Sequence, residues 1–262
     1  QKILKLRASP DIHVDQLTAI IEADPALAAQ VMSWAASPYY ASKGKISSVE
    51  DAIVRALGFD MVMGLALGLA LGKKFSLPRS LQDDSIVHWK RALLCASLIE
   101  GLLRQLPAAQ RPEPGLAYLT GLLHNFGYLL LAYLFPPYFG MIQTHQQNNP
   151  ELCPLQIDQE LLGMTRNDIC ASLMHLWNMP EELIVAIAEQ SNRNYQGSYD
   201  NYVQLLQLAN LLLNSEQNDD SEEQLQLLCQ ALGLQPEAAQ QALDRVLAAQ
   251  EALRSLSEQM GS

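Results

Sequence analysis

Apolar residues recur at helical spacing along most of the chain, in short segments that end at glycine, proline or asparagine. Ile20 and Ile21, for example, lie three and four residues after Leu17, which places all of them on one face of a helix. Glycine, proline and asparagine cap or interrupt helices, so each segment predicts a separate helix. Aromatic residues make up only 6% of the sequence, while leucine and alanine abound, which favours packed helices over sheets. The sequence therefore predicts an all-α fold.

Loop-forming stretches divide the predicted helices into two lobes and an appendage. A loop over 76–85 separates an N-terminal helical lobe, residues 1–80, from a second helical lobe, residues 81–214. The polar stretch SEQNDDSEE, residues 215–223, is predicted to link this lobe to a C-terminal helical appendage within 215–262. With 49% hydrophobic residues, the chain can bury a real core in each lobe. Whether the appendage folds back on the core or pairs with another copy is left open, as is the oligomeric state.

Local signals mark several helix ends. Ser48, followed by Asp51 three residues later, predicts a capping box, and Gly58 predicts the end of that helix. The sequence Phe-Pro-Pro-Tyr at 135–138 predicts the end of another helix, because proline interrupts backbone hydrogen bonding.

Charge and hydropathy exclude two classes of partner. A formal net charge of −11 opposes binding of nucleic acid through a broad basic surface, although a small basic pocket is compatible with it. The apolar stretch MVMGLALGLAL at 61–71 is much shorter than the roughly 20 residues that span a membrane. The four-residue spacing of Gly64, Gly68 and Gly72 instead predicts a core helix that packs closely against a neighbour. We expect neither a nucleic acid nor a membrane as partner.

The cysteines indicate a reducing compartment. Cys95, Cys153, Cys170 and Cys229 form no CxxC pair, and each lies within or beside an apolar stretch. They are predicted to be free core thiols of a cytoplasmic protein. Residues 1–16 also lack the apolar core of a signal peptide, which fits a cytoplasmic location.

The stretch GLLHNFG, residues 121–127, carries the strongest chemical signal. His124 lies in an otherwise apolar helical run, and Asn125 follows it. An aspartate in place of Asn125 would complete a His-Asp pair of metal ligands. The pair is therefore a metal site, the remnant of one, or a buried histidine with its neighbour.

Several stretches together resemble the HDOD domain family. LTAIIEADPALAAQVMSWAASPYY followed by ISSVEDAIVRALGFDMV is similar to the opening lobe of that family. GLLHNFG resembles its Gly-Leu-Leu-His-Asp-x-Gly element, and ELLGMTRNDICASLMHLWNMPEELIVAIAEQ resembles its Leu-Gly-x-x-His to Trp-x-x-Pro segment. The resemblance covers roughly residues 3 to 212, in consistent order. It implies a two-lobed helical domain similar to the HD phosphohydrolases, whose helical core binds metal through histidine and aspartate side chains.

The same resemblance implies which positions once held the metal. They are Arg91, His124, Asn125, Arg166, Glu189, Gln190 and Asn210. Only His124 keeps the residue type of the family pattern. An amide is a poorer ligand than a carboxylate, and a permanently charged guanidinium repels a cation. We therefore expect no metal or other cofactor, no catalytic residue, and a buried His124 that hydrogen-bonds Asn125 or Asn210.

The resemblance leaves a choice of function. It implies a non-enzymatic regulatory module of a bacterial signalling pathway that contacts a protein partner, through Tyr39 and Tyr40 or through the terminal helices. An alternative is a metal-dependent phosphohydrolase with a shifted ligand set, made of His88, His124, Asp168 and Glu189.

The two arginines of the former metal positions allow a further alternative. If Arg91 and Arg166 converge, they can bind a small anionic ligand such as a nucleotide phosphate. Ordinary salt bridges to Asp168 or Glu189 are the competing interpretation.

The remaining histidines are assigned structural roles. His13 and His145 are predicted to lie in polar loops, and His175 is predicted to serve packing or an interface.

Overall fold

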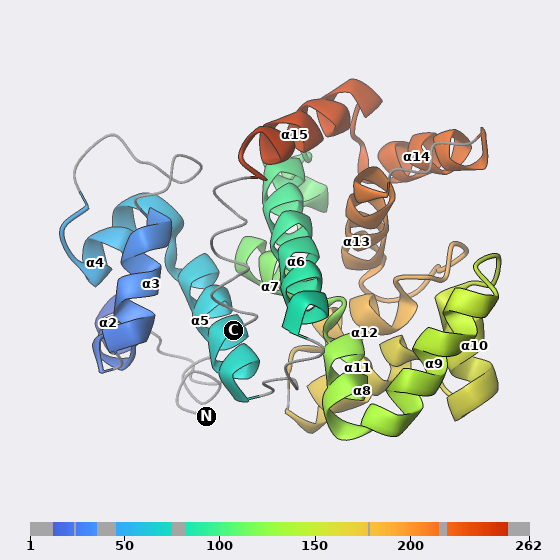
Figure 1. Cartoon of the computed structure of the whole chain (residues 1–262). Coiled ribbons are helices and arrows are strands. Elements are labelled where there is room, and N and C mark those ends of the chain that lie inside the picture. The colour runs from blue at the N-terminus through green and yellow to red at the C-terminus, as the bar shows by residue number, and fades with distance from the viewer. Residues whose placement is uncertain are drawn as a thin grey trace.

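The computed structural model describes residues 13–23, 25–35, 46–74, 82–177, 179–214 and 219–250, and all regular secondary structure within them is helical (Figure 1). The predicted all-α fold is confirmed. The helices of the N-terminal part are α2 (Val14–Glu22), α3 (Pro25–Ala35), α4 (Val49–Asp51), the π-helix η1 (Ala52–Leu57) and α5 (Phe59–Lys74). They pack on one another around fully buried Leu17, Val31 and Trp34.

The second part of the chain is larger and centres on a long helix. Its helices are α6 (Gln82–Leu103), the 3-10 helix η3 (Ala108–Gln110), α7 (Pro114–Leu123), α8 (Phe126–Leu134), α9 (Pro136–Asn148), α10 (Pro154–Leu162), α11 (Arg166–Leu176), α12 (Glu181–Glu189), α13 (Asp200–Leu213), α14 (Asp219–Leu232) and α15 (Pro236–Ala248). Helix α6 runs through the middle of the molecule, with α7 behind it and α13 beside it (Figure 1).

Helices α5 and α7 join the two parts. A methyl group added at Gly64 of α5 would lie 3.5 Å from the ring of Tyr118 on α7. Gly64 therefore faces α7, as the predicted packing of this glycine face against a neighbour requires, but the distance is an ordinary van der Waals contact and does not demand a glycine. Among the described residues no single helix has the length and apolar character of a membrane span, although α7 and α8 together meet that criterion across a 42° bend.

The local helix signals are confirmed in part. Ser48 accepts a hydrogen bond from the backbone N–H of Asp51, and Gly58 ends the π-helix with a positive φ of 84°. The predicted capping box is incomplete, because the Asp51 side chain accepts from the backbone N–H and the hydroxyl of Ser47 instead of the N–H of Ser48. Helix α8 ends at Leu134, one residue before the predicted stop, and Pro136 then opens α9. Proline is favoured there because the first turn of a helix does not need its N–H group.

Two predicted loops are shorter than expected. Helix α6 begins at Gln82, inside the predicted loop over 76–85, and α14 begins at Asp219, inside the predicted linker over 215–223. Acidic residues occupy both helix starts in the sequence, and they stabilise a helix N-terminus by opposing its dipole. The polar composition of these stretches thus reflects helix starts as well as loops.

The C-terminal helices fold back on the second lobe. Helix α14 packs against α13, and α15 packs against α6 (Figure 1). Ala239, Ala242 and Val246 of α15 are buried, and a methyl group at Gly101 of α6 would lie 3.5 Å from the Cβ of Ala242. Within this chain the appendage therefore covers the core.

The cysteine prediction holds for all but one residue. Cys95, Cys170 and Cys229 are buried free thiols, whereas Cys153 is a free thiol exposed at the surface. The prediction for Cys153 is wrong because this residue precedes the first turn of α10, where its backbone N–H donates to the side chain of Gln156.

Candidate functional site

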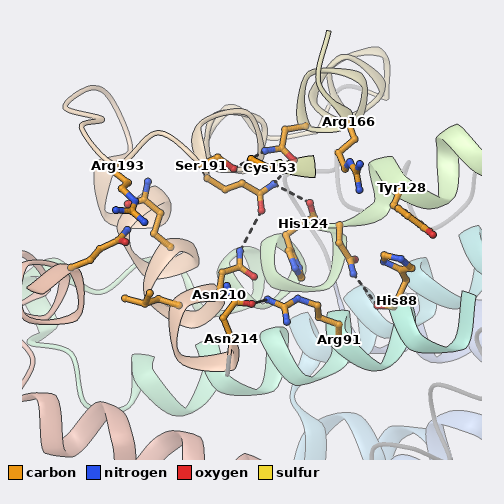
Figure 2. Close-up of a pocket in the computed structure, with 16 residues that line it drawn as sticks. His88, Arg91, His124, Tyr128, Cys153, Arg166, Ser191, Arg193, Asn210 and Asn214 are labelled. Atoms are coloured by element: carbon orange, nitrogen blue, oxygen red, sulfur yellow. Dashed lines mark hydrogen bonds between the residues drawn. The ribbon is translucent and has the colours of Figure 1, made fainter. Parts of the chain in front are cut away.

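Residues of α6, α8, α11, α13 and α14 line a cavity of about 480 Å³, together with residues at the end of α7, before α10 and after α12 (Figure 2). Of the positions expected from the sequence, all except Glu189 border it: Arg91, His124, Asn125, Arg166, Gln190 and Asn210. His88 and Tyr128 also border it, together with Cys153, Asn167, Ser191, Arg193, Gln207, Leu211, Asn214 and Gln224. The positions expected from the sequence therefore meet at this site, but they are fewer than half of the residues that line it.

The apolar run around GLLHNFG indicated a single helix, but the stretch forms the junction of α7 and α8. His124 is the C-cap residue of α7, and Asn125 directly precedes α8. Both motif glycines are sites of close backbone approach. A methyl group at Gly121 would lie 2.9 Å from Cα of Ala96 on α6, and one at Gly127 would lie 2.1 Å from the carbonyl oxygen of Arg166. The glycines thus let α6 and α11 pack tightly on either side of His124.

His124 is buried and bonded to its own helix. Its Nδ1 lies 2.6 Å from the carbonyl oxygen of Gly121, so Nδ1 carries the proton and Nε2 is the acceptor. The prediction that His124 bonds Asn125 or Asn210 is wrong. The last turn of a helix leaves backbone carbonyl groups without a partner, and His124 bonds one of these instead. Burial is the main cause that lowers the pKa of His124 to about 4; the Gly121 bond opposes the shift and the charge of Arg91 adds to it. His124 is therefore neutral at pH 7.

The amides at the positions that the family pattern assigns to metal ligands bind backbone groups and one another. The Asn125 side chain donates to the carbonyl oxygen of His88 at 2.9 Å. Gln190 donates to the carbonyl oxygen of His124 at 3.0 Å and to Oδ1 of Asn167 at 3.2 Å, and Asn210 donates to Oε1 of Gln190 at 3.3 Å (Figure 2). This network ties α7, α11, α12 and α13 together without any charged group.

Arg166 forms a buried ion pair with a residue that sequence reasoning missed. Its Nε lies 2.5 Å from Oδ2 of Asp158 and its Nη2 lies 2.8 Å from Oδ1, and Asp158 is fully buried. The prediction that Arg166 pairs with Asp168 or Glu189 is wrong. Asp168 instead caps α11 through Thr165. The available signal was the place of Asp158 next to buried Ile157, on the face of α10 that turns inward.

Arg91 has no carboxylate partner among the described residues. Its Nη2 donates to Oδ1 of Asn214, a neutral amide, at 2.8 Å. The arginines that do form ion pairs in the described part of the chain are other ones, including Arg193, which pairs with Asp220 at 2.7 Å. The positive charge of Arg91 at the cavity is therefore not neutralised by this part of the protein.

His88 faces the same cavity as Arg91, as their spacing on one helix indicated. Its ring stacks on Tyr128 with centroids 3.6 Å apart, and its Nδ1 is buried with no hydrogen-bond partner in the described residues. Burial is the main cause that lowers the pKa of His88 to about 3, followed by the charges of Arg166, His124 and Arg91. His88 is neutral at pH 7.

The side chains present do not fit a metal ion. Within the described ranges no three His, Cys, Asp or Glu residues are grouped so that they could hold one. Of the shifted ligand set, His88 and His124 border the cavity, whereas Asp168 and Glu189 do not. A metal at the two histidines would also lie among permanently charged guanidinium groups.

Other residues singled out in the sequence lie away from the cavity or beyond the described ranges. Tyr39 and Tyr40 lie outside the described residues. His13 precedes α2 and His175 is exposed on α11. The loop prediction for His145 is wrong, because α9 extends to Asn148 and includes it.

Comparison with known proteins identifies the family. The HDOD domain model matches residues 1–193. A solved structure from Marinobacter aquaeolei VT8, described as a candidate signal transduction protein, is 38% identical with a TM-score of 0.83, and the match covers 100% of this chain and 58% of that one. A solved candidate phosphohydrolase from Shewanella amazonensis SB2B is 20% identical with a TM-score of 0.73, covering 97% and 91% of the two chains.

A sequence relative from Treponema pallidum (strain Nichols), an uncharacterized protein, is 22% identical over 194 residues, which are 73% of this chain and 36% of the relative. This chain thus spans about a third of the Treponema protein and little more than half of the Marinobacter one. The match to the family model extends over most of the chain, and the cavity has formed from the positions that this family's pattern indicated. The chain belongs to the HDOD domain family.

Proposed function

We propose that this chain is a regulatory module of a bacterial signalling pathway, which acts through contacts with a protein partner in the cytoplasm and does not hydrolyse phosphoesters. The observation that carries the proposal is the content of the cavity. Arg91, Asn125, Arg166, Gln190 and Asn210 occupy the expected metal positions.

Hydrolysis by a metal requires several anionic or neutral donors around one ion and an open position for water. The cavity offers His88 and His124 as neutral donors. Its amides are engaged in the network around Gln190, and the buried carboxylate of Asp158 is held by Arg166. Two histidines beside permanent cations are a weak basis for a catalytic metal.

The relatives favour a signalling role. The Marinobacter protein, 38% identical, is described as a candidate signal transduction protein. The Shewanella protein is described as a candidate phosphohydrolase, but at 20% identity it shares only the fold with this chain.

Exposed apolar side chains support the protein-contact part of the proposal. They cluster where α8 turns into α9, and they are Tyr133, Leu134, Phe135, Tyr138 and Met141. Large exposed apolar groups close together are typical of surfaces that bind other proteins.

Metal content and turnover test the proposal. The protein is produced in medium supplemented with Mn, Fe, Ni and Zn, its bound metal is measured by mass spectrometry, and hydrolysis of bis(p-nitrophenyl) phosphate is followed. We expect metal far below one ion per chain and no turnover above a buffer blank. Stoichiometric metal, with turnover that His124→Ala abolishes and His145→Ala retains, would overturn the proposal. His145 is the matched control because it lies on α9, outside the cavity.

A further inference from the structure

The cavity is positively charged although the chain is strongly acidic. The formal net charge of the chain is −11, yet no aspartate or glutamate is among the described residues that border the cavity. Arginines border it from separate elements: Arg91 from α6, Arg166 from α11 and Arg193 from the segment after α12 (Figure 2). Such an inversion of charge favours anions over the surrounding surface.

These arginines differ in how much charge they leave to the cavity. Asp158 pairs with Arg166, and Asp220 pairs with Arg193. Arg91 donates to the neutral amide of Asn214. A guanidinium has five N–H donors, so most of the hydrogen-bonding capacity of Arg91 is left for a ligand. Arg91 is the residue that makes the cavity cationic.

Other polar groups reinforce this charge. The first turn of α8 borders the cavity through Asn125 and Tyr128. Asn125 does not cap the helix, because its amide donates to the carbonyl oxygen of His88. The positive end of the helix dipole thus adds to the field of Arg91. Nδ1 of His88 is a buried polar atom without a partner in the described part of the chain, which a ligand or a proton can satisfy.

Size and geometry define the kind of anion. A cavity of about 480 Å³ lies within the range of roughly 300–1,000 Å³ that is usual for small organic ligands, so it has room for more than a bare ion. A planar carboxylate is satisfied by a single arginine fork, whereas a phosphate presents oxygens in several directions. Cations and donors on separate walls match a phosphate better. The neutral amides around Gln190 suit the polar remainder of such a molecule.

We propose that this cavity binds a small organic phosphate, with Arg91 as the principal contact to the phosphate, His88 beside it on α6 and Arg166 on α11 across from them. The proposal rests on the proposed function, because it requires that protein side chains, and not a metal ion, contact the phosphate. Ligand binding is then the input of the module, and no bond of the ligand is broken.

Isothermal titration calorimetry on the whole chain, treated with EDTA, tests the proposal. The titrants are inorganic phosphate, AMP and GMP, with citrate as a carboxylate of comparable charge. We expect saturable binding of AMP or GMP, tighter than that of phosphate or citrate. Arg91→Met should weaken it by about tenfold or more, as loss of a charge-assisted contact does. Arg104→Met is the matched control, since Arg104 directly follows the same helix, pairs with Glu100 and does not border the cavity. It should bind as the wild type does.

Absence of binding by wild type, equal affinity for citrate and the nucleotides, or equal affinity of Arg91→Met and wild type would each overturn the phosphate site. Chromatography of the ligand after incubation separates this failure from failure of the proposed function. If the nucleotides are recovered intact, both with and without added Mn²⁺, the proposed non-hydrolytic function stands, whatever affinity the calorimetry gives. Hydrolysis that appears only with added Mn²⁺ would overturn the proposed function and, with it, the metal-free site.

Discussion

Arg166 and Asp158 form a bidentate ion pair beside the cavity, with N–O distances of 2.5 and 2.8 Å, and the carboxylate is fully buried. The backbone N–H of Arg166 also donates to Asp158 at 3.1 Å. Asp158 therefore fixes the start of α11 as well as the guanidinium. A buried pair of this kind costs much more to break than it contributes when intact, because the remaining charge is left without its partner.

Asp158→Asn should lower the free energy of unfolding by about 3 kcal/mol, since it leaves the Arg166 guanidinium unpaired in a mostly buried site. Urea denaturation followed by circular dichroism measures the change. Asp220→Asn is the control, because its pair with Arg193 is exposed, and it should cost less than about 1 kcal/mol. Equal costs for the two substitutions would show that burial of Asp158 does not matter.

Gly127→Ala should destabilise the fold by roughly 1–3 kcal/mol, the usual range for an overpacked core. The added methyl group would lie 2.1 Å from the carbonyl oxygen of Arg166, so α8 and α11 must move apart. Gly140→Ala on α9 is the matched control, since nothing lies within 4 Å of its added methyl group. That substitution should stabilise the protein by up to about 1 kcal/mol through helix propensity. Thermal denaturation of both variants measures these changes in stability. A Gly127→Ala variant as stable as the wild type would contradict the close approach of Gly127 to the Arg166 carbonyl.

The fold should lose stability as the pH falls below about 6.5. The pKa of His88 is lowered to about 3 and that of His124 to about 4 in the folded protein, so the unfolded chain takes up protons first. For one such histidine, the loss between pH 7 and pH 5 is about 2 kcal/mol.

His88→Phe, which retains an aromatic ring against Tyr128, tests this pH dependence. Its unfolding free energy should fall less between pH 7 and pH 5 than that of the wild type, by about the same 2 kcal/mol. His175→Phe, at an exposed position, should keep the wild-type dependence. Identical curves for His88→Phe and wild type would mean that His88 is not held neutral by the fold.

Iodoacetamide at pH 7.5 should modify Cys153 alone in the folded protein. Cys153 is exposed, whereas burial raises the pKa of Cys95 and Cys170 to about 12 and also raises that of Cys229. The thiolate is the reactive form, so these three thiols are both shielded and protonated. Peptide mass spectrometry identifies the modified residue, and Cys153→Ser should abolish the reaction. Rapid labelling of Cys95 or Cys170 would contradict their burial.

The features that the sequence predicted correctly are those set by neighbours along the chain. The cap at Ser48, the stop at Gly58 and the proline start of α9 each depend on a few adjacent residues. Helical spacing likewise placed His88 and Arg91 on one face. The cavity residues that were predicted came from the family pattern rather than from local signals.

The features that it missed depend on how helices are placed relative to one another. Asp158 lies only eight residues before Arg166, but the turn between α10 and α11 decides which of several carboxylates meets the guanidinium. The break after His124 lets α7 pack against α5 and α12 while α8 packs against α9 and α11, and an apolar run does not reveal such a change of neighbours. The exposure of Cys153 follows from the position of α10 at the surface.

Helix α7 links the cavity to the N-terminal lobe. Its ten residues form a rod about 15 Å long, with His124 at one end in the cavity wall and Tyr118 midway along it, against Gly64 of α5. At the cavity end of this helix, the Gln190 side chain donates a hydrogen bond to the carbonyl oxygen of His124. The wall of the cavity and the packing against the lobe that carries α2 to α5 therefore share one helix, and a ligand that shifts the His124 carbonyl would act on that helix.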